Sequence, residues 1–170
     1  MPWRCGTAPG TRWAPTHPTP CAGGTIGSTR AGTDGHDRRR YDKTVPLNVV
    51  YARELSAAGV LEAIARGHSY LSSGPELGLE VRLRDGRTAT MGDAVAAADL
   101  AEVRVSWRGA PAEARASWVV NGEEAAHWAG GQGEQLAPRP PEARWGVLEL
   151  RGPDGAMLAL SNPIYLMRDP

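Results

Sequence analysis

The sequence contains no phenylalanine and only two cysteines, Cys5 and Cys21, among its 170 residues. Two cysteines do not require a disulfide, so we expect a reduced, cytoplasmic protein. An excess of charge is also missing, since 19 basic residues balance 19 acidic ones, and this favours neither nucleic acid nor a membrane surface as a partner. No apolar run approaches the roughly 20 residues that cross a bilayer. The start, MPWRCGTAPGTRW, lacks the apolar stretch of a secretory signal.

Residues 1–30 are crowded with Pro, Gly, Thr and Arg and show neither the strand nor the helix period of apolar residues. Such a segment buries too little apolar surface to offset the entropy lost on ordering. We therefore expect residues 1–30 to be a disordered or non-native leader. A non-native leader would come from a wrong start site or a shifted reading frame, and composition does not separate the two interpretations.

The chain becomes regular after residue 44. The stretch VPLNVVYA, residues 45–52, predicts a buried strand. Residues 56–66 predict a helix that Ser56 caps and Gly67 ends. HSYLSSGP, which follows, predicts a second short strand closed by a Gly-Pro turn. A strand, a helix and a second strand within about 30 residues fit the size of one βαβ-type unit.

The expected helix carries its apolar residues on one face. Val60, Leu61 and Ile64 recur at helical spacing. We expect this face to pack against the preceding strand, which contains Val49 and Val50.

From residue 77 the apolar period becomes two, and turn signals recur at residues 85–86, 121–122 and 152–155. This pattern predicts a small antiparallel β-sandwich over residues 77–168. Residues 93–99, DAVAAAD, are an exception, because their alanines favour a helical turn. The side chains expected in the core are Val103, Val105, Trp107, Trp118, Trp128, Trp145, Val147 and Leu160.

Several of these stretches together resemble the C-terminal part of PHP-domain (polymerase and histidinol phosphatase-like) metallohydrolases, most of all the CehA/McbA-type branch. Members commonly show a Ser-Asp-x-His loop, a strand like VVYA, a helix, a Gly-x-x-Tyr-hydrophobic-Ser-x-Gly-Pro segment, and a β-sandwich with an Asn-Pro-Ile-Tyr end. The matching segments here are Thr33–His36, Val49–Ala52, residues 56–66, Gly67–Pro75 and Ser161–Leu166. The resemblance covers about residues 31–168.

The resemblance implies an α+β fold in two parts. Residues 31–76 would be a remnant of the last strand-helix-strand unit of the PHP β/α barrel, and residues 77–170 would be the β-sandwich domain. It also implies metal-dependent hydrolysis of a small-molecule phosphoester or a related ester or carbamate. Such a site needs two or more divalent ions roughly 3.5–4 Å apart.

Asp34 and His36 match the last pair of metal ligands in that family. The sequence has no His-x-His motif, and the only histidine before this pair is His17. We therefore expect a truncated C-terminal portion that lacks most metal ligands. It would bind Zn, Mn or Fe weakly or not at all, and the chain alone would be inactive.

Two alternatives remain open. Asp34 and His36 fit a polar turn as well, and the sandwich fits a non-catalytic binding or interaction module. A zinc site of mixed Cys and His ligands has the right residue types but matches no ordinary zinc spacing. The residues of that set are Cys5, His17, Cys21 and His36.

We expect the other polar residues that could belong to a functional site to have no catalytic role. We expect His68 to be a surface residue or a helix-end residue that interacts with the last carbonyls of the helix, and His127 to be a structural strand residue. The run Arg38–Arg40 fits a solvated loop better than a site that binds a substrate phosphate. Ser72 and Ser73 lack a nearby base, so nucleophilic catalysis there is not expected.

Overall fold

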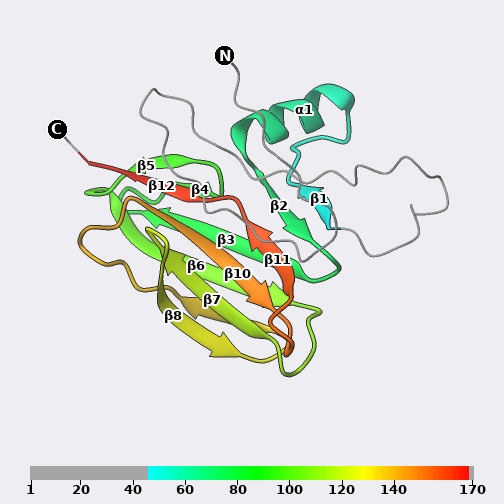
Figure 1. Ribbon diagram of the computed structural model, residues 1–170. Coiled ribbons are helices and arrows are strands. Elements are labelled where there is room, and N and C mark those ends of the chain that lie inside the picture. The colour runs from blue at the N-terminus through cyan, green and yellow to red at the C-terminus, as the bar shows by residue number, and fades with distance from the viewer. Residues whose placement is uncertain (1–45, 169–170) are drawn as a thin grey trace, which may run out of the picture.

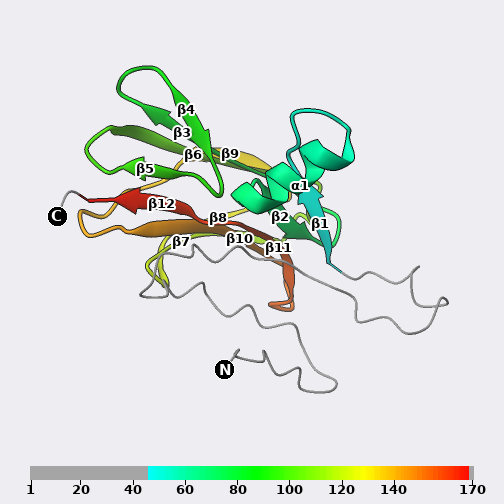
Figure 2. The same cartoon turned by 90° about the horizontal axis from the view of Figure 1, so that it is seen from above.

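Two β-sheets and one helix make up residues 46–168, which are the residues that this computed structural model describes. The two sheets lie face to face (Figures 1 and 2). Apolar side chains form the core between them. The larger sheet has eight strands and the smaller has four. This part of the chain is therefore α+β with the layers of a β-sandwich, as the sequence predicts.

The larger sheet follows the order β1-β2-β11-β10-β12-β5, and β7 and β8 extend it from the other edge of β10. Its strands are β1 (Leu47–Val50), β2 (Ser69–Ser72), β5 (Ala94–Ala96), β7 (Arg115–Val120), β8 (Glu123–Ala129), β10 (Trp145–Arg151), β11 (Met157–Ser161) and β12 (Ile164–Met167). The smaller sheet follows the order β4-β3-β6-β9. Its strands are β3 (Glu76–Leu83), β4 (Thr88–Thr90), β6 (Leu100–Arg108) and β9 (Gly133–Leu136).

Period-two patterning places the core as expected. Trp128 is only partly buried, and its ring stacks on that of Trp107 with the centroids 5.8 Å apart. Alternate residues of β10 point to opposite faces of the sheet, so Trp145 and Val147 belong to a second cluster on the face away from the main core. The other predicted core side chains are all buried: Val103, Val105, Trp107, Trp118, Trp145, Val147 and Leu160.

The predicted turns also form. Asp85 and Gly86 lie between β3 and β4, and the Pro-Asp-Gly turn lies between β10 and β11. Asn121 and Gly122 join β7 to β8 with φ angles of 53° and 93°. Positive φ at both residues is what a two-residue hairpin turn of the Asn-Gly type requires.

Helix α1 (Ala57–Arg66) confirms the predicted element and both of its ends. The Ser56 side chain accepts a hydrogen bond from the Gly59 amide, and Gly67 ends the helix with a left-handed φ of 74°. The prediction that Leu61 belongs to the packed face of the helix is wrong, because the Leu61 side chain is 67% exposed. Gly59 and Ala63 are the buried residues instead, so small side chains let the helix approach its neighbours closely.

Strand β1 is not the buried strand that its apolar sequence predicts. It lies at the edge of the larger sheet, and Leu47 is 65% exposed. Its only partner in the described sheet is β2, which runs antiparallel to it. The strand-helix-strand order is therefore confirmed, but the pairing is not the parallel crossover of a βαβ unit. Strand β2 in turn pairs with β11, which joins this unit to the sandwich.

The expectation of a helical turn over residues 93–99 is wrong. Residues 94–96 form β5, which pairs in parallel with β12. The Val95 side chain is buried in the main core. Burial and strand pairing therefore override the helical preference of the neighbouring alanines.

Within residues 46–168, no helix has the length and the apolar character that a membrane span requires.

Candidate functional site

The predicted metal ligands Asp34 and His36 lie outside the described residues, so their role stays a prediction. The same holds for Cys5, Cys21 and the other members of the alternative zinc set, and for the run at residues 38–40. Within residues 46–168, no group of three or more His, Cys, Asp or Glu side chains could hold a metal ion.

His68 makes a contact that the sequence does not predict. Its Nε2 lies 2.9 Å from Oδ1 of Asp93, in the loop between β4 and β5. The other carboxylate oxygen of Asp93 accepts a hydrogen bond from the Thr90 amide at 2.9 Å. The expected interaction with the helix-end carbonyls is therefore wrong for the ring; it is the His68 backbone amide that donates to the Ala63 carbonyl. The pair fixes the end of α1 against the sandwich.

A second junction joins the two most specific segments of the sequence resemblance. The buried Asn162 side chain donates from Nδ2 to the Ser69 carbonyl at 2.8 Å and to the Ser69 hydroxyl at 3.0 Å. Gly92, next to Asp93, donates its amide to the Pro163 carbonyl at 2.7 Å. The segments at residues 67–75 and 161–166 therefore meet in space and hold the helix and β2 on the sandwich.

The Ser72 side chain makes its hydrogen bonds within the turn that follows β2. Its hydroxyl donates to the Pro75 carbonyl and accepts a hydrogen bond from the Gly74 amide. Both contacts stabilise the Gly-Pro turn between β2 and β3. His127 is exposed on β8 and lies 3.0 Å from the Glu124 carboxylate, which agrees with a structural strand residue.

A groove lies over the outer face of the smaller sheet, near these junctions. We call it the β3/β6 groove. Gly78 and Ser106, which are register partners, form its floor. It has two adjacent parts of about 530 and 560 Å³, and Tyr51 and Glu134 border both of them. One part extends to His68 and the other extends to β9.

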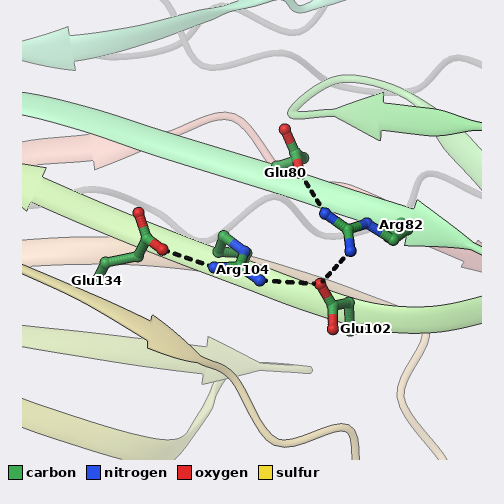
Figure 3. A network of polar contacts seen from close by, with 5 residues as sticks. All are labelled: Glu80, Arg82, Glu102, Arg104 and Glu134. Atoms are coloured by element: carbon green, nitrogen blue, oxygen red, sulfur yellow. Dashed lines mark hydrogen bonds and ion pairs between the residues drawn. The ribbon is translucent and has the colours of Figure 1, made fainter.

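Charged side chains of alternating sign cross this face (Figure 3). Arg104 on β6 lies 2.6 Å from Glu134 on β9 and 3.1 Å from Glu102, and Arg82 continues the chain from Glu102 to Glu80. These contacts raise the pKa of Arg104, chiefly through its hydrogen bonds to Glu134 and Glu102. Arg104 therefore stays charged, and neighbouring carboxylates lie beside both it and Arg82.

Tyr51 is held rigidly at the rim of the groove. Its hydroxyl donates to the Leu77 carbonyl, and its ring centroid lies 5.8 Å from that of Tyr70 at a tilt of 40°. Burial is the largest cause that raises the pKa of Tyr51 to about 12, so the phenol is neutral at physiological pH. The Tyr51 ring therefore lies at the rim of the groove beside hydrogen-bonding side chains.

The groove offers hydrogen-bonding side chains and an aromatic ring to a bound molecule. Within residues 46–168, His68 is hydrogen-bonded to Asp93 but to no serine, threonine or cysteine hydroxyl or thiol that it could activate. The groove was not predicted from the sequence. The alternation in β3 and β6 places Gly78 and Ser106 on the outer faces, but only the strand register brings them together.

Comparisons with protein-family models, curated proteins and solved structures found no match for this chain.

Proposed function

We propose that this chain is the C-terminal part of a PHP-type metal-dependent hydrolase that acts on a small phosphoester or a related ester or carbamate. The observation that carries the proposal is the junction between residues 67–75 and 161–166. These segments are the most specific parts of the sequence resemblance, and Asn162 hydrogen-bonds directly to Ser69 between them. Because the two segments contact each other, their occurrence together and in this order in one chain has a structural reason.

In this proposal Asp34 and His36 would contribute two ligands to a divalent ion, Zn, Mn or Fe. A carboxylate and an imidazole suit these metals. The ion would polarise the scissile oxygen and lower the pKa of a bound water. Catalytic sites usually have three or more protein ligands, so the remaining ligands would come from other residues. The low cysteine content favours a cytoplasmic location.

Translation of the DNA that precedes the Met1 codon tests this proposal. All three reading frames would be searched for a His-x-His motif followed by Glu and His, and then by a Ser-Asp-x-His loop. The proposal expects these ligands in one frame, and a chain extended to include them should hydrolyse model phosphoesters. Their absence from every frame would count against the hydrolase.

The β3/β6 groove favours a second function, a non-catalytic binding module. Its floor, rim and charged walls all come from described residues and need no metal. A substitution that fills the groove should then abolish ligand binding without changing any metal-dependent reaction. Loss of hydrolysis together with loss of groove binding would instead place the groove within the hydrolase site.

A further inference from the structure

We propose that the β3/β6 groove binds a neutral, hydroxyl-rich ligand of the oligosaccharide class. This inference rests on the binding-module function and specifies its ligand. Four observations support it: the charge balance of the lining, the free polar groups in the lining, the exposed ring at the rim, and the shape of the groove.

The charges that line the groove nearly cancel. Three arginines, at positions 53, 104 and 108, stand against four carboxylates, at positions 76, 80, 93 and 134. Most of them are paired with one another; Arg108, for example, lies 2.7 Å from Glu76 through its Nε. A strongly charged ligand would have to break these pairs, whereas sugar hydroxyls can donate to the carboxylates and accept from the guanidinium groups without breaking them.

The lining of the groove keeps unused hydrogen-bonding groups open to a ligand. Within residues 46–168, the hydroxyls of Ser106 and Thr88 and the side-chain amide of Gln132 make no hydrogen bond. A Cβ atom on Gly78 would collide with the Ser106 hydroxyl, so the glycine is what keeps this hydroxyl accessible. Polar groups of this kind, few and fixed in position, give small-molecule sites their specificity.

The Tyr51 ring supplies the apolar contact that a sugar face needs. The residue is 45% exposed, and its hydroxyl is already engaged by the Leu77 carbonyl. This hydrogen bond orients the ring, which offers an amphipathic surface beside the polar floor.

The dimensions favour more than one sugar ring. Each part of the groove falls within the roughly 300–1,000 Å³ of small-molecule sites. The two parts share Tyr51, Gly78, Ser106 and Glu134, so one elongated ligand can occupy both.

Titration calorimetry with the 170-residue chain tests the inference. The probes are soluble neutral oligosaccharides of two to six units (gluco-, xylo- and manno-configured), with a sulfated oligosaccharide and an acidic peptide as charged comparisons. We expect at least one neutral probe to bind with a Kd of about 1 mM or tighter. Ser106→Arg, which fills the floor, should weaken this binding by about tenfold or more, and Tyr51→Ala should also weaken it. His127→Ala on β8, outside the groove, is the matched control and should leave it unchanged.

The dependence of binding on salt concentration distinguishes neutral ligands from charged ones. Binding of a neutral probe should change little between about 50 and 500 mM salt, because no net charge is neutralised. If only the charged probes bind, and Ser106→Arg abolishes that binding, the oligosaccharide inference fails while the binding module stands. If no probe binds to the folded chain, or if Ser106→Arg leaves binding intact, the β3/β6 groove is not the site.

Discussion

Tyr51 shows how one residue can be both a structural anchor and part of a surface. Its folded-state pKa of about 12 lies above the ordinary value of 10.0, because burial disfavours the phenolate. The stability that the neutral phenol contributes is therefore complete below pH 10 and is lost as the pH rises towards 12. We expect the urea midpoint to fall between about pH 10 and about pH 12, and to fall less steeply in Tyr51→Phe, which cannot ionise. Identical pH profiles for both proteins would contradict this account of Tyr51.

Asn162 is the residue on which the junction between helix and sandwich depends. Its side chain is fully buried, and it makes two hydrogen bonds to Ser69. Asn162→Ala should lower the free energy of unfolding by about 1–3 kcal/mol, since it leaves buried polar groups poorly satisfied. Chemical denaturation measures this loss. Thr88→Ala, which removes an exposed hydroxyl, is the control and should change stability by less than about 0.5 kcal/mol. An equal effect of both substitutions would show that the junction contributes little.

At the scale of single elements, helix α1 depends on the left-handed residue at its end. Gly67 has a φ of 74°, and its amide bonds to carbonyls of the last turn. Gly67→Ala should therefore cost about 1 kcal/mol, because a Cβ atom is strained in this conformation. Gly67→Asn should cost less, since asparagine tolerates left-handed backbone better than alanine does. Thermal unfolding of the two variants distinguishes them, and an asparagine variant less stable than the alanine one would contradict the argument.

Local sequence signals predicted where the helix, the strands and the turns lie better than they predicted which residues are buried. Ser56, Gly67 and the Asn-Gly turn act within a few residues, so the caps and hairpins could be read directly from the chain. Leu61 and Leu47 look like core residues in sequence, yet both are exposed, because burial depends on which distant segments pack nearby. The parallel partner of β5 lies some seventy residues along the chain, so local preference pointed to the wrong structure.

At the scale of the whole molecule, the described part of the chain is one layered body with the strand-helix-strand unit built into it. Strand β2 pairs with β11, and the His68–Asp93 and Asn162–Ser69 contacts also hold the helix and β2 against the sandwich. The sequence predicted the sandwich but not the antiparallel pairing of β1 with β2. The β3/β6 groove could not be predicted at all, because it depends on strand register and on the approach of Tyr51 from another sheet.

The measurement that tests the central claim most directly is metal binding by the 170-residue chain. The purified protein would be dialysed and titrated with Zn and with Mn, beside the Asp34→Ala and His36→Ala variants. We predict weak binding, below one metal per chain after dialysis, that either substitution removes, because two protein ligands hold a divalent ion poorly. Model phosphoesters should be hydrolysed no faster by the wild-type chain than by Asp34→Ala. Metal binding that neither substitution changes would contradict the assignment of this pair as ligands, and with it the proposed hydrolase.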